Sequence, residues 1–143
     1  MITIAVSWPS NKLSPNARVH WSKRYEASRA IRNEAAWATR AVVKPGTFVP
    51  AMPVSVITTF YPPVRYHFDE DNLKARCKAI YDGIADAIGV DDRHFRHQPV
   101  VIGETCPGGK VVVQIAPADT WEHISEPLAR VIASIPLPKR GAA

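Results

Sequence analysis

The pattern of apolar and polar positions in the first half of the chain predicts a strand, a helix and a second strand. Apolar residues alternate with polar or small ones over residues 2–6, which predicts a short strand, and turn-forming residues over 8–16 predict a loop after it. A helix is expected from about Ser22, whose hydroxyl suits an N-cap, to about Val42. Its apolar side recurs at helical spacing and consists of Ala27, Ile31, Ala35, Ala38 and Val42. Residues 54–61 predict a second strand, because β-branched and aromatic residues lie there between two prolines.

The most regular pattern in the second half is an apolar stripe with spacings of three and four. It predicts one helix over residues 73–88, which ends before Gly89 and whose stripe consists of Leu73, Cys77, Ile80, Ile84 and Ile88. Two further strands are expected over residues 99–105 and 110–116, joined as a hairpin by a turn at residues 107–109. Ser125 would cap a last helix, whose buried side is formed by Leu128, Val131 and Ile135.

This order of elements predicts an α+β fold, in which a small mixed β-sheet packs with two main helices. A chain of 143 residues has room for one hydrophobic core, so we expect a single domain over residues 1–135 and a flexible tail over 136–143. Five prolines interrupt the longest uncharged stretch, residues 45–64, which argues against a transmembrane helix. The start of the chain lacks the pattern of a signal peptide, so we expect a cytoplasmic protein without a membrane partner.

Charge is distributed unevenly along the chain, whose formal net charge is +5. Residues 12–44 carry eight basic side chains and only two acidic ones, whereas residues 69–92 hold seven of the thirteen acidic residues. A basic surface attracts a polyanion before any specific contact forms. We therefore expect a phosphate-rich ligand to bind beside a cation-binding centre. Cys77 and Cys106 are too far apart in the sequence to predict a zinc site or a disulfide framework, and are expected to be reduced thiols.

Acidic residues cluster at the two ends of the helix expected over residues 73–88. Asp69, Asp71 and Asn72 precede this helix, and Asp91 and Asp92 follow it. Carboxylate oxygens are the ligands that Mg²⁺ prefers, and a bound Mg²⁺ can activate water for phosphodiester hydrolysis. Each group alone is also typical of an ordinary N-cap or turn. Together they favour a metal site, because the three carboxylates of Asp69, Glu70 and Asp71 repel one another unless a cation neutralises them.

The same stretch resembles the signature of the RusA family of Holliday-junction resolvases. The matching residues are Asp69-x-Asp71-Asn72, then Lys78-x-x-x-Asp82-Gly83, then Asp91-Asp92. The opening of the chain, with Pro9-Ser10 and Leu13-Ser14-Pro15-Asn16, is similar to that of phage-borne members. By the order of its elements, the resemblance covers residues 2–117.

The resemblance implies a homodimeric, Mg²⁺-dependent endonuclease that binds four-way DNA junctions and cuts two strands symmetrically, with Mn²⁺ as a possible substitute ion. By position, the catalytic and metal-binding carboxylates would be Asp69, Asp71 and Asp92. Lys78 matches the family's catalytic lysine by its spacing to Asp82, whereas Lys74 matches it by its spacing to Asp71; we favour Lys78, as the contact to the scissile phosphate. Supporting roles are implied for Asn72, Asp82 and Asp91, with Asp82 otherwise only a helical partner of Lys78. DNA contacts are expected from the basic residues Lys12, Arg18, Lys23, Arg24, Arg29 and Arg32.

The length of the predicted helix decides whether the two acidic groups can meet. A straight helix over residues 73–87 would be about 22 Å long, whereas an extended link from Ile88 to Asp92 spans only about 17 Å. Convergence therefore requires a shorter helix, an acidic loop that lies along the side of the helix, or a second subunit that completes the site. We expect one of the first two.

Several features allow more than one interpretation. Trp21, Tyr25 and Trp37 are interleaved with basic residues, so they would either stack on bases or pack in the core. His94 and His97 are expected to be surface residues, because they would not share a face of a strand. Two alternative functions are a catalytically silent protein that binds DNA junctions or duplexes, in which the acids only cap and turn, and a metal-dependent hydrolase of small nucleotides.

Overall fold

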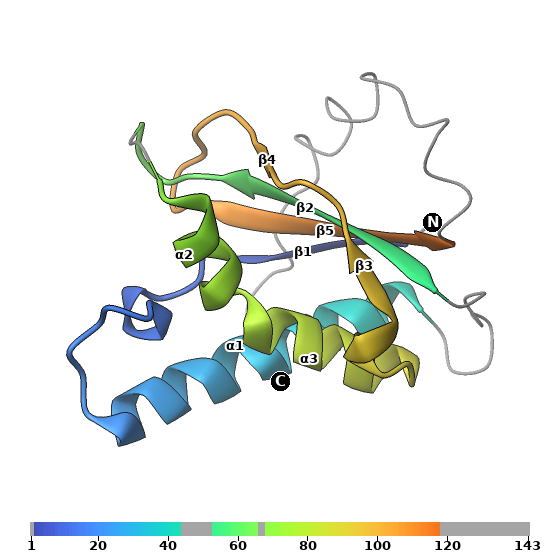
Figure 1. The fold of residues 1–143 in the computed structure, drawn as a ribbon, viewed down its shortest axis with the longest axis horizontal. Helices are drawn as coiled ribbons and strands as arrows, with labels where there is room; N and C mark the ends of the chain where they lie inside the picture. The colour runs from blue at the N-terminus through green and yellow to red at the C-terminus, as the bar shows by residue number, and fades with distance from the viewer. Residues whose placement is uncertain (1, 44–52, 66–67, 118–143) are drawn as a thin grey trace.

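The computed structural model describes residues 2–43, 53–65 and 68–117 of the chain. Within these ranges the chain forms a mixed β-sheet and three α-helices, which confirms the expected α+β class (Figure 1). The helix expected from Ser125, the expected domain end at residue 135 and the expected tail all lie outside the described residues.

Five strands form one sheet, namely β1 (Ile2–Ser7), β2 (Val54–Tyr61), β3 (Phe95–His97), β4 (Val101–Ile102) and β5 (Lys110–Pro117). Strand β5 lies between β1 and β2 and pairs antiparallel with both. The other edge of β2 pairs in parallel with β3 and β4, so the sheet is mixed. The strands predicted at residues 2–6 and 54–61 are confirmed as β1 and β2. Both are rich in β-branched residues, which favour the extended conformation.

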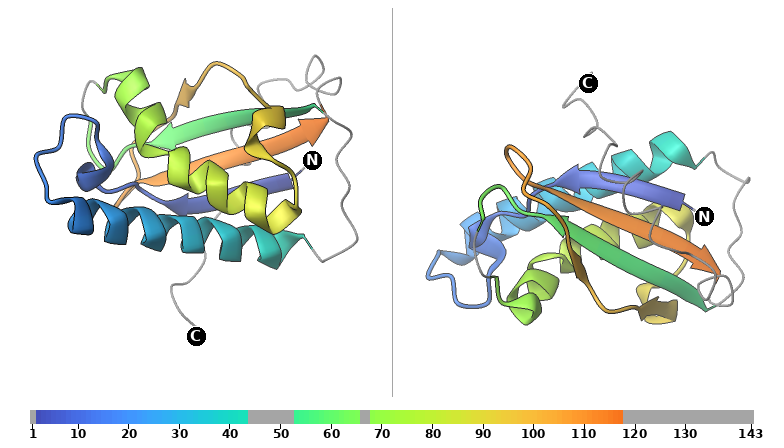
Figure 2. Two further views of the ribbon diagram at one scale, coloured as in Figure 1. Left: turned by 60° about the horizontal axis from the view of Figure 1, so that its bottom comes forward. Right: turned by 90° about the horizontal axis from the view of Figure 1, so that it is seen from above.

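Three helices pack on the sheet, namely α1 (Trp21–Val42), α2 (Glu70–Arg76) and α3 (Lys78–Ile88). Figure 2 shows α1 and α3 side by side along one face of the sheet. The described residues also contain two short 3₁₀ helices, η1 (Asn11–Leu13) before α1 and η2 (Asp92–His94) after α3. None of the helices in the described ranges has both the length and the apolar character that crossing a membrane requires.

The bounds of α1 agree with the prediction to within one residue, but its N-cap and the exposure of Val42 differ from it. His20 rather than Ser22 is the N-cap: Nδ1 of His20 accepts the backbone N–H of Ser22 at 3.2 Å and lies 2.7 Å from the Ser22 hydroxyl. At the other end, Val42 is 56% exposed and does not belong to the buried side. The buried residues of α1 lie between Ile31 and Thr39, in the C-terminal half of the helix.

The single helix predicted over residues 73–88 is instead two helices that meet at Cys77. The backbone of Cys77 has φ −93° and ψ −2°, and its N–H bonds to the carbonyl of Lys74, three residues back, at 3.0 Å. This tighter 3₁₀-type turn separates α2 from α3 while keeping the apolar stripe buried. The spacing of the stripe therefore does not reveal the break. Gly89 ends α3 as expected, in the left-handed conformation with φ 71°.

The predicted hairpin between residues 99–105 and 110–116 is wrong. Residues 107–109 do reverse the chain, but β2 lies between the two strands that they connect. Thr59 of β2 pairs with Val101 on one side and with Val112 on the other. The reason is the length of the ladders: β4 has only two residues, whereas β2 gives β5 an antiparallel partner along eight.

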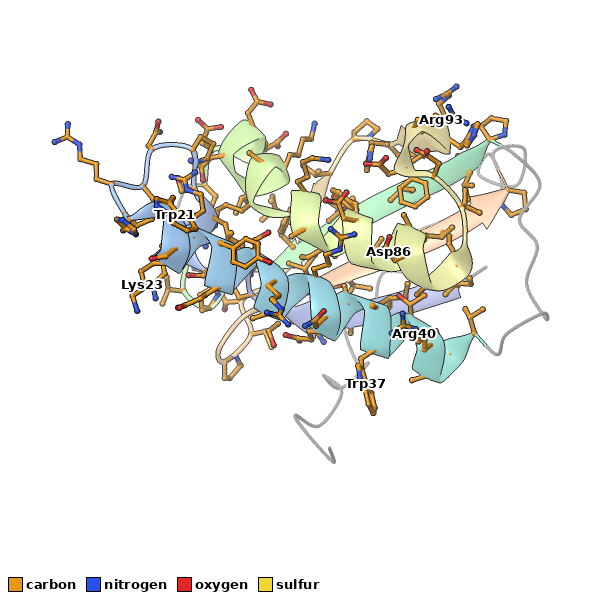
Figure 3. All side chains as sticks on the ribbon, turned by 90° about the horizontal axis from the view of Figure 1, so that it is seen from below. Trp21, Lys23, Trp37, Arg40, Asp86 and Arg93 are labelled. Carbon is orange, nitrogen blue, oxygen red and sulfur yellow. The ribbon has the colours of Figure 1, made fainter. Side chains whose placement is uncertain are left out.

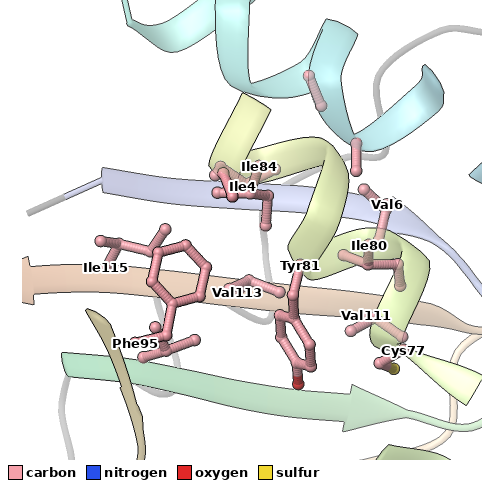
Figure 4. Packing of buried hydrophobic residues seen from close by; sticks show 14 of the residues in the cluster. Ile4, Val6, Cys77, Ile80, Tyr81, Ile84, Phe95, Val111, Val113 and Ile115 are labelled. Carbon is pink, nitrogen blue, oxygen red and sulfur yellow. The ribbon is translucent and has the colours of Figure 1, made fainter. Parts of the chain in front are cut away.

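The hydrophobic core lies between the sheet and the helices α1 and α3. Figure 4 shows Ile80 and Ile84 of α3 over Ile4 of β1 and Val113 of β5, all four fully buried. Gly83 allows the two helices to approach closely, because a Cβ atom there would overlap the carbonyl oxygen of Arg32 on α1. This packing fixes where the N-terminal end of α3 and the residues beside it lie.

Candidate functional site

The acidic residues before α2 act first as its N-terminal cap. Oδ1 of Asp69 accepts the backbone N–H groups of Asp71 at 2.9 Å and Asn72 at 3.2 Å. This bond satisfies donors that the first turn of a helix leaves free. Asp71 and Glu70 lie exposed in that first turn. Asp69 therefore fills the ordinary capping role, and the carboxylate of Asp71 faces solvent.

The start of α2 is anchored to the loop that follows β1. Nδ2 of Asn72 donates a hydrogen bond to Oγ of Ser14 at 2.8 Å, across 58 positions of sequence. Ser14 lies in the stretch that resembles the opening of phage-borne RusA proteins. The structure thus joins two separate parts of that resemblance and assigns Asn72 a supporting contact.

Arg76 is a buried cation at this site that the sequence analysis did not identify. Its side chain is only 5% exposed, Nη2 donates to the carbonyl of Pro9, and the guanidinium lies 5.7 Å from the centre of the Trp8 ring. Burial lowers the pKa of Arg76, and its Nε has no hydrogen-bond partner among the described residues. The signal in the sequence is its position three residues after Leu73, which puts a charge on the apolar side of the helix.

Lys78 connects the helix motif to the paired aspartates. Its Nζ lies 3.4 Å from Oδ1 of Asp82 and 3.6 Å from Oδ2 of Asp92. Asp82 is thus the helical partner of Lys78, and η2 brings Asp92 within reach of the Lys78 ammonium group. The helix is shorter than predicted, since it is divided at Cys77, and the segment after α3 returns to the Lys78 side chain. Among the described residues, however, Asp92 does not join Asp69 and Asp71 in a group that could hold a metal ion.

A cavity of about 370 Å³ opens beside Lys78. Its polar lining consists of Thr58, Lys74, Lys78, Tyr81, Asp92, His97 and Gln98. Oη of Tyr81 is hydrogen-bonded to Oγ1 of Thr58 at 2.6 Å, and burial raises the pKa of Tyr81, so the phenol stays protonated at neutral pH. Lys74, unlike Lys78, makes no ion pair with another residue that the structure describes. The cavity therefore presents one paired and one unpaired ammonium group.

His97 contributes its ring to this cavity. The residue keeps solvent contact, as expected, but its ring lies 4.5 Å from the ring of Tyr81 in an edge-to-face arrangement. Loss of solvent around the ring lowers the pKa of His97, and the nearby Lys74 lowers it further, whereas Asp92 opposes the shift. His94 lies in η2, where its Nε2 is 3.3 Å from Nε of Arg93. At neutral pH the imidazole of His97 is accordingly uncharged.

A second cavity, of about 440 Å³, lies between α1 and the C-terminal half of α3. Its charged lining residues are Arg32, Asp82, Asp86, Asp91 and Asp92. Nη2 of Arg32 lies 2.6 Å from Oδ2 of Asp86, the residue labelled on α3 in Figure 3, so this ion pair ties the two helices together. Asp91 caps η2 by accepting the backbone N–H of Arg93 at 3.0 Å, which lowers the pKa of Asp91. Asp91 therefore has the ordinary role of a turn residue.

The carboxylates that the resemblance assigns to the metal are not gathered around one point. Within residues 2–43, 53–65 and 68–117, no group of three or more His, Cys, Asp or Glu side chains is placed so that it could hold a metal ion. Seven positions separate Asp71 from Lys78, about 10 Å by helical rise, and Asp92 lies at the Lys78 end. The carboxylate of Asp69 is also turned to the backbone of α2. As placed, Asp69, Asp71 and Asp92 do not fit Mg²⁺ as a ready ligand set.

The six basic residues expected to contact DNA fall into two groups. Three of them have partners within the chain: Arg32 pairs with α3, Nη2 of Arg24 donates to the carbonyl of Ala17 at 2.9 Å, and Lys23 lies 3.8 Å from Glu26. The remaining three are exposed and make no ion pair with a described residue, namely Lys12, Arg18 and Arg29. The second group is free to meet an anionic ligand.

Comparison with known proteins places the chain in a family without revealing an activity. No family model matches the sequence. A protein of Xylella fastidiosa (strain Temecula1), itself described as uncharacterized, is 41% identical over 116 residues, which cover 80% of this chain and 76% of that protein. At this identity and coverage, the chain belongs to the same family as the Xylella protein.

Proposed function

We propose that the protein is a RusA-like endonuclease that binds branched DNA as a homodimer and cuts it by phosphodiester hydrolysis. The observation that supports this most directly is the contact between Lys78 and Asp92, whose charged atoms lie 3.6 Å apart although 14 positions separate the residues. The contact brings a residue that follows α3 to the side chain of the first residue of α3. Two separate pieces of the signature thus come together at one cavity.

The residues around this cavity suit a phosphate group. Lys74 offers an ammonium without an acidic partner among the described residues, and Lys78 offers a second one that is held in place by Asp92. In the proposed reaction, Lys74 and Lys78 bind and orient the phosphodiester, and the protonated Tyr81 keeps the cavity wall rigid through Thr58. Free basic residues such as Arg18 and Arg29 would hold the DNA arms, since phosphate contacts position a duplex.

The requirement for Mg²⁺, or Mn²⁺ in its place, comes from the resemblance. Asp69, Asp71 and Asp92 do not form a ligand set as they are placed among the described residues, so no step of the proposed reaction is assigned to the ion.

Cleavage of a synthetic four-way junction tests the proposal. We expect paired, symmetric nicks in the junction with Mg²⁺ present, and no cut in a linear duplex of matched sequence. Asp71→Asn and Asp92→Asn are expected to abolish the nicks. Glu70→Gln is the matched control, because Glu70 is an exposed carboxylate of the same stretch that has no assigned role. A junction that stays intact with wild-type protein and Mg²⁺ would refute the nuclease.

A second candidate is a catalytically silent protein that binds DNA junctions or duplexes. It is favoured by the carboxylates of Asp69 and Asp91, both of which cap helices through backbone N–H groups. Calorimetric titration with Mg²⁺ separates the two candidates. Binding in the micromolar to millimolar range that Asp71→Asn removes supports the enzyme, whereas tight junction binding without any heat from Mg²⁺ supports the silent binding protein.

A further inference from the structure

Helix α1 carries a line of exposed residues that winds around its surface. Trp21, Tyr25 and Trp37 are 73%, 61% and 66% exposed, and Arg29 and Asn33 between them are exposed as well. We call these five residues the α1 ridge. The sequence left open whether the aromatic residues pack in the core, and the structure shows that they do not. Figure 3 shows Trp21 at one end of α1 and Trp37 projecting away from the fold.

The α1 ridge is one continuous row on the helix surface. Its members follow one another at intervals of four residues, which is the spacing of side chains that form a ridge along a helix. Each step rises about 6 Å, so the row from Trp21 to Trp37 is about 24 Å long. Each step also turns the side chain by about 40° around the helix axis, so the row winds by about 160° from Trp21 to Trp37. A ligand that contacts the whole row must therefore be flexible enough to follow it around the helix.

Packing within the described fold does not account for these aromatic residues. The buried side of α1 is formed by other residues, among them Ile31, Ala35 and Ala38. Single exposed apolar side chains are common on protein surfaces and need no explanation, whereas several large ones in a row mark a contact surface. Trp21, Tyr25 and Trp37 are three large exposed side chains on one helix, so they indicate a contact surface.

The charge along the α1 ridge is positive. Arg29 lies between Tyr25 and Trp37 and has no ion pair with a described residue. The two acidic residues of α1 do not offset it: Glu26 lies 3.8 Å from Lys23, and Oε1 of Glu34 accepts the backbone N–H of Ser7 at 2.7 Å. A ligand for this surface therefore needs flat apolar groups together with negative charge.

We propose that the α1 ridge binds an unpaired nucleic-acid strand, whose bases stack on Trp21, Tyr25 and Trp37 and whose phosphates pair with Arg29. A strand of nucleic acid carries flat bases, which can stack on the aromatic rings, and regularly spaced phosphates, which can pair with the arginine. A second copy of the chain fits less well, because two-fold pairing of the ridge would bring Arg29 near its own counterpart, and like charges repel. The inference extends the proposed function, since branched DNA that opens at its crossover exposes such bases.

Two oligonucleotides of equal charge test the proposal. Fluorescence anisotropy would compare a labelled twelve-residue dT strand with an abasic strand of the same length, in EDTA so that no cleavage occurs. We expect wild-type protein to bind the dT strand at least about tenfold more tightly than the abasic strand, because stacking on each ring has an effect of about that size.

Variants along the α1 ridge identify the groups responsible. Trp21→Ala and Trp37→Ala should each weaken dT binding about tenfold and leave abasic binding unchanged, while Trp21→Phe keeps a ring and retains most of the affinity. Arg29→Gln should weaken binding of both strands alike. Arg96→Gln is the control for general charge, because Arg96 is exposed on β3, outside α1, and has no assigned role. Circular dichroism melting curves confirm that each variant is folded.

Equal affinity of the wild-type protein for the two strands would overturn the inference. So would unchanged dT binding by Trp37→Ala together with a smaller sedimentation coefficient, because that result assigns the α1 ridge to self-association. The outcome is independent of the nuclease. Ring-dependent dT binding by a protein that leaves the junction intact refutes only the proposed cleavage, whereas junction cleavage without any preference for dT refutes only the role of the ridge.

Discussion

The ammonium group of Lys78, at the first position of α3, lies 3.6 Å from a carboxylate oxygen of Asp92 in η2. The same ammonium lies 3.4 Å from Asp82, one turn along α3. Lys78 is therefore shared between a helical neighbour and a residue that returns from beyond the end of the helix. Lys74, one helix earlier, faces the same cavity without an acidic partner among the described residues. This arrangement distinguishes the two lysines that the sequence left as alternatives.

The proposed function predicts different results for the two lysines. Lys78→Gln should reduce junction cleavage about 100-fold, because a charge that stabilises a transition state is lost and Asp92 is released. The free energy of unfolding should change by less than about 1 kcal/mol, since the Lys78 side chain is exposed.

Lys74→Gln should chiefly raise KM, because it removes an anchor for the phosphodiester. Single-turnover and steady-state rates measure both effects, with Arg40→Gln as the surface control, because Arg40 is exposed in the last turn of α1 and has no assigned role. Equal kcat and KM for all three variants would contradict the assignment.

Gly83 predicts a reversal of the usual effect of a Gly→Ala substitution in a helix. Intrinsic helix propensity alone would make Gly83→Ala stabilising by about 1 kcal/mol. The added Cβ would instead overlap the carbonyl oxygen of Arg32 and lie 3.1 Å from Cβ of Ala35, so α1 and α3 must move apart. We expect a loss of about 3 kcal/mol, at the upper end for overpacking, because a backbone group cannot rotate away. Urea unfolding measures it.

Gly89→Ala is the control for that measurement. A Cβ at Gly89 meets no atom within 4 Å, but the residue has φ 71°, which side chains disfavour by about 1–2 kcal/mol. The clash at Gly83 should therefore be the larger of the two losses. A Gly83→Ala protein as stable as the wild type would show that α1 and α3 do not pack as described.

His97 predicts a pH dependence of stability in the absence of divalent ions. Its pKa is lowered in the folded protein, chiefly by loss of solvent and then by Lys74, so the unfolded chain binds the proton more readily. Stability therefore rises with pH through the interval between the lowered pKa and the ordinary value near 6.5, and is lost on acidification through that interval. His97→Gln should flatten this part of the profile. Chemical unfolding at a series of pH values in EDTA tests it, and parallel profiles for the two proteins would contradict it.

The two thiols should differ sharply in reactivity. Cys77 is fully buried, and burial raises its pKa to about 12, so almost no thiolate is present at pH 8. Cys106 is only partly buried. A thiol reagent such as Ellman's should therefore modify one cysteine of the native protein quickly and the second only after unfolding in denaturant. In Cys106→Ser, the fast reaction should disappear. Rapid modification of Cys77 in the native protein would show that the junction of α2 and α3 opens readily.

Local patterns in the sequence were sufficient for the elements that depend on neighbouring residues. The strand at residues 54–61 follows from its β-branched composition between two prolines, and the end of α3 follows from Gly89, which adopts the left-handed conformation that favours glycine. Asp69 also caps a helix, as residues of its type do. The acidic and lysine residues of the candidate site were named by their resemblance to a signature, which specifies order along the chain.

Distances between these residues were decided only by tertiary packing. The apolar stripe keeps its spacing through Cys77, so the sequence alone determined a buried helical face but concealed the break that divides it. Likewise, the turn at residues 107–109 could be predicted from the sequence. The position of β2 between β4 and β5 could not, because it depends on strand pairing between residues some fifty positions apart. Periodicity records which side of an element is buried, because that is a local property. It does not record which elements meet, because those contacts are selected by the packing of the whole core, and that packing is what places Asp92 beside Lys78.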